Sequence, residues 1–283
     1  MREYRFRIVN VFVREGRLSG NPLAVVEDGS GLDDATMQAL ALQFNLSETT
    51  FVLPSSTATA RVRIFTPTFE MPFAGHPTLG SAHVVRALLG TGDAVTLEMR
   101  AGIVPVNADG DRWTLEAKAP RTREVSASRE QLAAMLGVTP ADLGTTPLWV
   151  DTGSEQLVIP LQSVAAVERC NPDAALIARY GKVGSGTERA MAYVWSHASA
   201  SAVTARFFFP KHGAVIEDPG TGSACANLGG WLVATGASRP QSLAISQGVA
   251  VGRPCQLGLA VDAAGRIFVS GQVVELGRGS LFL

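Results

Sequence analysis

Short apolar runs rich in β-branched and aromatic residues dominate the first 65 positions of the chain. They occupy residues 6–13, 23–27, 50–53 and 61–65, and the turn-forming residues 19–22 (SGNP) separate the first two. Strands favour these residue types, and the run 61–65 alternates polar and apolar positions like a strand with one face in water. We therefore expect the chain to open as a β-meander.

Two helical patterns interrupt these strands. Behind Asp33, a suitable N-cap, four apolar residues repeat at helical spacing and predict a helix that ends near Asn45. These residues are Met37, Leu40, Ala41 and Phe44. The second pattern, residues 77–89, follows the Pro- and Gly-rich stretch 67–80, starts with proline and stops before Gly90. Because it is almost entirely apolar, this helix is expected inside a sheet.

The second half of the chain repeats the order of the first. After strands at 94–99, 103–106 and 112–118, the polar segment 119–127 reads as a connection. We predict a first domain of residues 1–118, completed by a C-terminal strand at 272–283, and a second domain of residues 128–271.

Local signals place the elements of this second domain. Residues 128–131 (SREQ) match a capping box, and Gly137 suits the helix end. Two short strands are expected within 147–160, and a helix from Asn171-Pro172 to Gly181. Strands at 191–195 and 203–209 then lead into a Gly-rich loop, 218–223, and a second apolar helix through Trp231 and Leu232.

A pair of spaced motifs supports a duplication. Phe65-x-Pro67 precedes Gly80-Ser81-Ala82 in the first half, as Phe208-x-Pro210 precedes Gly222-Ser223-Ala224 in the second. The predicted fold class is therefore α+β, with two pseudo-repeated lobes. Each lobe has a mainly antiparallel sheet wrapped around a central apolar helix.

Composition narrows the function. The 283 residues carry a formal charge of −1, are 46% hydrophobic, and contain no run of Lys or Arg that would follow a line of phosphates. No segment approaches the length of a membrane span, and the N-terminus lacks the apolar run of a signal peptide. We expect a cytoplasmic protein whose partners include no nucleic acid and no membrane. Neither the three cysteines nor the four histidines have metal-ligand spacing, so no metal site is predicted.

The two Gly-rich loops are candidate anion sites. Each loop leads from a strand into an apolar helix, and free N–H groups with the positive end of the helix dipole attract an anion there. Two such helix starts facing each other would hold a small carboxylate between the lobes. The alternative is that each loop only turns the chain.

Three ionisable residues have positions that suit acid–base chemistry. Glu48 lies between an amphipathic helix and an apolar strand, where partial desolvation would raise its pKa and suit it to exchange protons near neutrality. His76 and Asp218 occupy corresponding loops, as opposed polar groups would. The alternatives are a solvated turn glutamate and a loop histidine bonded to nearby backbone.

Several longer motifs resemble one family. These are SGNPLAVV (19–26), NLSETTFVL (45–53), FTPTFEMPFAGHPTLGSA (65–82), EDPGTGSA (217–224) and QGVAVGRP (247–254). They resemble, in the same order and spacing, the signature segments of PhzF-like phenazine biosynthesis proteins. The resemblance covers essentially the whole chain.

This resemblance implies a diaminopimelate epimerase-like fold with the site between the lobes, no cofactor and a homodimer. The implied function is that of an isomerase that moves a proton between carbons of a small carboxylate such as trans-2,3-dihydro-3-hydroxyanthranilate. The family's catalytic residues correspond to Glu48, His76 and Asp218. The resemblance also implies substrate binding by residues of the matching segments, to which we add their neighbours. The combined set is Asn21, Ser47, Gly75, Thr221, Gly222 and Ser223.

Two other functions compete with this interpretation. The second loop, 218–223, is Asp-Pro-Gly-Thr-Gly-Ser in this chain, whereas the corresponding loop of the phenazine enzyme is similar to Asp-Ala-Ala-Thr-Gly-Ser. This difference leaves the identity of the substrate undecided. An amino-acid racemase or epimerase of the same fold would need a thiol at each helix start, but Ala74 and Asp218 or Pro219 occupy those positions. Cys225 reads as a buried structural thiol. A non-catalytic carboxylate-binding protein is the other alternative.

Overall fold

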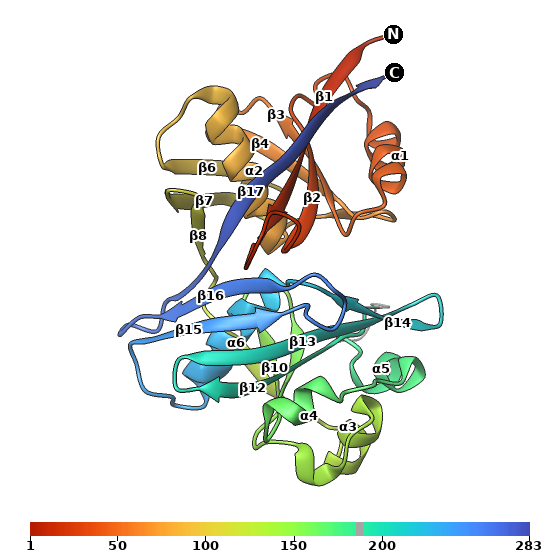
Figure 1. Cartoon of the computed structure of the whole chain (residues 1–283), viewed down its shortest axis with the longest axis vertical. Helices are drawn as coiled ribbons and strands as arrows, with labels where there is room; N and C mark the ends of the chain where they lie inside the picture. The colour runs from red at the N-terminus through yellow and green to blue at the C-terminus, as the bar shows by residue number, and fades with distance from the viewer. Residues whose placement is uncertain (185–188) are drawn as a thin grey trace. The chain divides into compact units, whose positions relative to one another are not determined.

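The computed structural model describes residues 1–184 and 189–283 and divides the chain into two compact units (Figure 1). Unit 1 comprises Met1–Glu116 and Ser270–Leu283, and unit 2 comprises Ala117–Val269. Both are mixed α and β structures in which antiparallel strand pairs predominate.

In unit 1, all of whose residues are described, the strands close into a barrel. They are β1 (Glu3–Val11), β2 (Asn21–Val26), β3 (Thr49–Leu53), β4 (Ala60–Phe65), β5 (Glu70–Met71), β6 (Ala94–Met99), β7 (Gly102–Asp109), β8 (Arg112–Glu116) and β17 (Ile267–Phe282). The ring runs β1-β2-β3-β4-β6-β7-β8, and β17 closes it by pairing with both β8 and β1. Figure 1 shows β17 beside β1, with the N- and C-termini at the same end.

Helix α2 (Gly75–Leu89) packs against most strands of this barrel. Its buried face includes Leu79, Ala82, Val84 and Val85. Gly80 allows the closest approach, since a Cβ there would lie 2.6 Å from Cδ2 of Leu23 on β2. The helix thus packs closely against β2 at Gly80.

Helix α1 (Asp34–Phe44) confirms the first helical pattern. The Asp33 side chain accepts the N–H of Thr36, and Asn45 ends the helix in the left-handed conformation (φ 51°). Met37, Leu40 and Ala41 are buried, as their spacing predicts. The end of α1 leads directly into the segment that carries Glu48.

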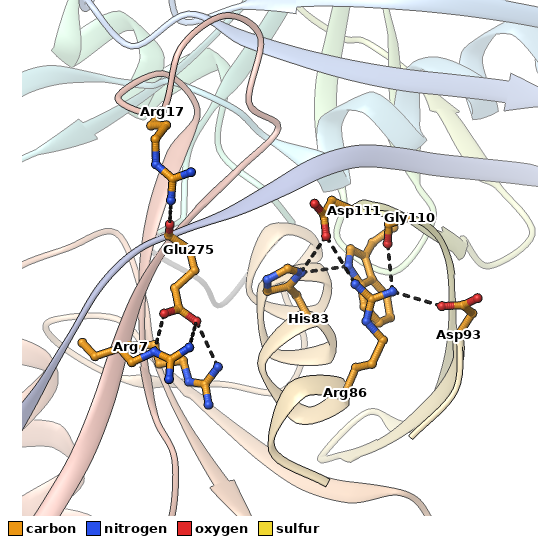
Figure 2. Close-up of polar contacts among 10 residues, drawn as sticks. Arg7, Arg17, His83, Arg86, Asp93, Gly110, Asp111 and Glu275 are labelled. Carbon is orange, nitrogen blue, oxygen red and sulfur yellow. Dashed lines mark hydrogen bonds and ion pairs between the residues drawn. The ribbon is translucent and has the colours of Figure 1, made fainter. Parts of the chain in front are cut away.

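An ion-pair cluster fastens β17 to β1 and β2. The buried Arg7 donates to Glu27 at 2.6 Å and to Glu275 at 2.9 Å. Figure 2 shows the guanidinium of Arg7 against the Glu275 carboxylate, with Arg17 reaching the backbone of the same residue. Ion pairs as well as backbone hydrogen bonds therefore hold the last strand, β17, in the barrel.

Unit 2 contains the remaining strands and helices. The strands are β9 (Arg121–Glu124), β10 (Leu148–Asp151), β11 (Gln156–Pro160), β12 (Ala192–Ser199), β13 (Ala202–Lys211), β14 (Ala214–Asp218), β15 (Gln241–Gln247) and β16 (Cys255–Val261). The helices are α3 (Arg129–Leu136), the 3-10 turn η1 (Pro140–Asp142), α4 (Val164–Glu168), α5 (Ala174–Tyr180) and α6 (Gly222–Ala234). Helix α6 packs against β9, β10, β11 and β16.

The strand pairings of unit 2 follow those of unit 1 in sequence order. β1 to β7 pair as antiparallel β1–β2, parallel β2–β3, antiparallel β3–β4 and β4–β5, parallel β4–β6 and antiparallel β6–β7. β10 to β16 repeat each of these pairings in the same order. In both series, an apolar helix stands before the sixth strand.

Several predicted boundaries are wrong. The segment 119–127, expected as a connection, contains β9, which pairs antiparallel with β10. The predicted loop 67–80 contains β5 and the first residues of α2. Helix α5 is capped by Asp173 rather than opened by Asn171-Pro172, and the short helix α4 was not expected. The capping box at Ser128 and the helix end at Gly137 are confirmed. Over the described ranges 1–184 and 189–283, no helix is long and apolar enough to span a membrane.

Candidate active site

Glu48 and His76 meet in unit 1. Glu48 directly precedes β3, His76 is the second residue of α2, and Oε2 of Glu48 lies 3.4 Å from Nε2 of His76. The Glu48 side chain is 15% exposed and that of His76 is 6% exposed. The turn after α1 and the first turn of α2 therefore bring together two residues that are 28 positions apart in the sequence.

Asn21 lies on the other side of the imidazole ring. It is the first residue of β2, it is buried, and its Nδ2 lies 3.4 Å from Nδ1 of His76. Burial lowers the pKa of His76 to about 3, and a hydrogen bond to the backbone of Pro22 only partly opposes this effect. The ring is thus neutral near pH 7 and is not a cationic partner for Glu48.

The first turn of α2 has no side-chain cap. Ala74 is the N-cap residue, no acidic residue occupies the first turn, and Gly75 and His76 are buried. Backbone N–H groups in such a turn have no i−4 carbonyl partner within the helix. The start of α2 can accordingly receive a carboxylate or another anion. Ser47 lies on the exposed turn before Glu48.

In unit 2, Asp218 is the last residue of β14 and contacts Thr221. The Thr221 hydroxyl donates to Oδ2 of Asp218, and its oxygen accepts no N–H from the helix α6 that it precedes. Gln247 at the end of β15 donates through Nε2 to the backbone carbonyl of Asp218 at 2.9 Å and to the Thr221 hydroxyl at 3.0 Å. The first turn of α6, with Gly222 and Ser223, therefore resembles that of α2 in having no side-chain cap.

A second hydrogen-bond chain fixes Ser223. Its hydroxyl accepts from Nε2 of Gln156 at 2.8 Å, and Oε1 of Gln156 accepts from Nδ2 of Asn227 at 2.8 Å. The same amide donates to Ser154, while Oδ1 of Asn227 accepts the N–H and hydroxyl of Thr152 at 2.9 and 2.7 Å. Asn227 is fully buried, so this network orders the start of α6 from inside unit 2.

Sequence reasoning missed the residues that hold the predicted site residues in place. Gln156, Asn227 and Gln247 were not expected, although Gln247 opens the motif QGVAVGRP. The sequence does offer one signal for this network, which is an amide inside an apolar helix, as at Asn227. Such a group needs hydrogen-bond partners when it is buried.

All three cysteines are buried, and Cys255 on β16 pairs with Gln247 on β15. Burial raises the pKa of Cys225 and Cys255 far above the ordinary range of a thiol, and raises that of Cys170 to about 11. Cys225 lies inside α6 with no exposed surface. Such thiols are not ionised at neutral pH and are poor nucleophiles.

The chain matches the family model described as phenazine biosynthesis-like protein over residues 9–279. An uncharacterized isomerase of Pasteurella multocida is 39% identical, covering 99% of this chain and 94% of that protein. The trans-2,3-dihydro-3-hydroxyanthranilate isomerase of Pseudomonas aeruginosa is 34% identical, covering 99% and 100%. The crystal structure of a PhzF family phenazine biosynthesis protein from Bacillus anthracis matches with a TM-score of 0.86 at 24% identity, each chain being covered completely.

The relatives define the class of enzyme: this protein is an isomerase. It belongs to the phenazine biosynthesis-like, or PhzF, family. The resemblance drawn from the sequence motifs is thereby confirmed.

Proposed function

We propose that this isomerase moves a proton between two carbons of a small carboxylate substrate and that Glu48 is the acid/base. The observation that carries the proposal is the contact of the half-buried Glu48 carboxylate with the buried, neutral His76 at the uncapped start of α2. A carboxylate there exchanges a proton with substrate while the helix start binds the substrate's own carboxylate. No cofactor is needed for such a transfer.

The residues of unit 2 enter the proposal through the family resemblance. Asp218 corresponds to a catalytic aspartate, and Thr221, Gly222 and Ser223 to substrate-binding residues. Their arrangement supports these roles, since Gln247 orders Asp218 and Gln156 orders Ser223. In unit 1, Gly75 would supply an N–H group to the substrate carboxylate, and Ser47 and Asn21 remain predicted binding residues.

We also propose that the two units are copies of one lobe, with α2 and α6 as central helices, in the manner of diaminopimelate epimerase. The repeated order of strand pairings supports this relation. A homodimer in the cytoplasm stays a prediction from the family resemblance. The substrate we propose to test first is trans-2,3-dihydro-3-hydroxyanthranilate, because a relative with 34% identity is named for its isomerisation.

The Glu48→Gln variant tests the role of Glu48. Glutamine keeps the size of the side chain but cannot cycle a proton, so turnover should fall by about 10²-fold or more while binding persists. Glu27→Gln is a matched control, because the Glu27 side chain is 14% exposed and its partner is Arg7 rather than His76. Near-normal turnover of a folded Glu48→Gln variant would remove Glu48 from the mechanism.

A further inference from the structure

Each ring nitrogen of His76 has a defined neighbour in unit 1. Nδ1 lies 3.4 Å from Nδ2 of Asn21, and Nε2 lies 3.4 Å from Oε2 of Glu48. The backbone of Pro22 offers a carbonyl acceptor to the ring as well. Neither Nε2 of His76 nor Oε2 of Glu48 is exposed to solvent. The protein neighbours therefore decide where the ring proton resides.

Because the ring is neutral near pH 7, it carries one proton, on either Nδ1 or Nε2. With the proton on Nδ1, the ring donates to Pro22, but the lone pair of Nε2 then points toward the Glu48 carboxylate and repels it. With the proton on Nε2, the ring donates toward Oε2 of Glu48, and Nδ1 accepts an amide N–H from Asn21. The second tautomer gives up the bond to Pro22, but it lets Nε2, which makes no hydrogen bond to the described residues of this structure, donate to Oε2 of Glu48 while that carboxylate is ionised.

We propose that Asn21 is a positioning residue that keeps the ring proton of His76 on Nε2, so that His76 holds Oε2 of Glu48 and leaves Oε1 to carry the substrate proton. This inference rests on the proposed function of Glu48. The substrate C–H bond breaks as the Oε1–H bond forms, and its electron pair stays on the substrate. The proton then returns to a different carbon, while His76 keeps its own proton throughout.

The identity of residue 21 decides this arrangement. An amide can donate to Nδ1, whereas a carboxylate can only accept and would draw the ring proton to that nitrogen. An alanine would remove the amide donor and leave the Pro22 carbonyl as an acceptor beside the ring, so the ring proton would again move to Nδ1. Asn21 is fully buried and pairs with Val11 across β1 and β2, so its side chain is held in place by the barrel.

The experiment is nitrogen NMR of the intact, substrate-free protein labelled with ¹⁵N-histidine, which distinguishes protonated from unprotonated ring nitrogens. Between about pH 5 and 8, wild-type His76 should carry its proton on Nε2. Asn21→Ala and Asn21→Asp should both move the proton to Nδ1. If the alanine variant does not fold, the nearly isosteric Asn21→Asp variant still provides the test.

His83 supplies an internal reference in the same spectrum. Its Nδ1 lies 3.3 Å from Nε1 of Trp113, which can only donate, so the His83 proton must be on Nε2. Figure 2 shows His83 beside Asp111, whose Oδ1 lies 3.9 Å from the same nitrogen. Its tautomer should not respond to either substitution of Asn21.

Kinetics separates positioning from substrate binding. As a positioning residue, Asn21 should affect kcat, by about 10-fold, the size of one charge-assisted hydrogen bond. KM should change little, and the acid limb of the pH profile should move to higher pH, because Glu48 loses a donor that favours its ionised form. A rise in KM alone would instead support substrate binding by Asn21 and overturn the inference.

The spectra decide independently of turnover. A proton on Nδ1 in the wild type, or a proton that stays on Nε2 in both variants, would overturn the positioning role. If the tautomers behave as expected but Glu48→Gln keeps its turnover, the proposed acid/base function fails while the assignment of the ring proton stands.

Discussion

Gly248 lies so close to Pro219 that a Cβ on Gly248 would be 2.4 Å from the Pro219 carbonyl oxygen. The same Cβ would be 2.4 Å from the carbonyl oxygen of Arg253, and the φ of Gly248 is +79°. Both obstacles are backbone atoms, which cannot rotate away. Glycine at this position therefore lets the segment after β15 support the turn that carries Asp218.

We predict that Gly248→Ala lowers both stability and turnover. The added methyl group must displace the Asp218 turn, in addition to the strain of about 1–2 kcal/mol that a positive φ imposes on alanine. Gly252→Ala is the matched control, since Gly252 has a φ of +68° but no atom within 4 Å of its Cβ position. Urea unfolding and turnover should show a small loss of stability for the control and a larger, combined loss for Gly248→Ala. Equal effects of both variants would contradict the supporting role.

Acid should destabilise unit 1 through Glu70. Its side chain accepts from Nε and Nη2 of Arg63 at 2.8 and 2.9 Å, and these bonds lower the pKa of Glu70, against the opposing effect of burial. A lowered folded-state pKa stabilises the protein above the unfolded value of 4.5, and this contribution is lost as pH falls through the folded-state value.

The test compares Glu70→Gln with the wild type by urea unfolding at several pH values. At neutral pH the free energy of unfolding of the variant should be about 1–2 kcal/mol lower than that of the wild type. This is the contribution of hydrogen bonds to a charged group when the site is partly screened by solvent. The difference between the two proteins should shrink as pH falls below 4.5 and vanish below the folded-state pKa of Glu70. Asp34→Asn is the control, since that carboxylate contacts the same arginine but is 82% exposed and should matter less.

The thiols should be dispensable for turnover. All three cysteines are buried, and burial raises the pKa of each. Replacement of all three by alanine should cost about 1 kcal/mol each through lost packing but leave the activity per folded molecule unchanged. Loss of activity in a folded variant would restore the thiol-dependent epimerase as a candidate.

The sequence predicted those elements whose signals are local. Asp33 and the apolar residues behind it define α1, and the capping box at Ser128 defines α3, because both depend on contacts within four positions. Strand β9 lacks such a signal: its four residues are all exposed and polar or charged, and only the pairing with β10 makes it a strand. Strand β5 has two residues and depends in the same way on its pairing with β4.

The site depends on contacts that no spacing rule reveals. Glu48 and His76 were named from their motifs, yet their 3.4 Å contact arises because β3 pairs with β2 and α2 packs against β2. The low pKa of His76 follows from burial in the barrel, which a Gly-His-Pro loop does not show. Asn21 was predicted to bind substrate, and its contact with His76 is visible only in the folded unit.

The route of the proton provides the last prediction, because one shuttling carboxylate and two opposed bases leave different labels. The Glu48 side chain is only 15% exposed, so a proton held by this carboxyl should exchange slowly with water once substrate covers it. Substrate deuterated at the carbon that loses its proton should therefore transfer part of the label to the new carbon.

Mass spectrometry and NMR of the product locate this label. Partial transfer to a different carbon would support Glu48 as a single base that takes and returns the same proton. A product with the proton moved to a new carbon but without deuterium would show that the Glu48 proton exchanges with water faster than it returns to the substrate. That result would exclude a shielded carboxyl, but it would still be an isomerisation. Inversion at the original carbon with complete loss of label is the result that two opposed bases give, since the second base delivers a solvent-derived proton to the opposite face. That outcome would replace the proposed isomerisation with epimerisation.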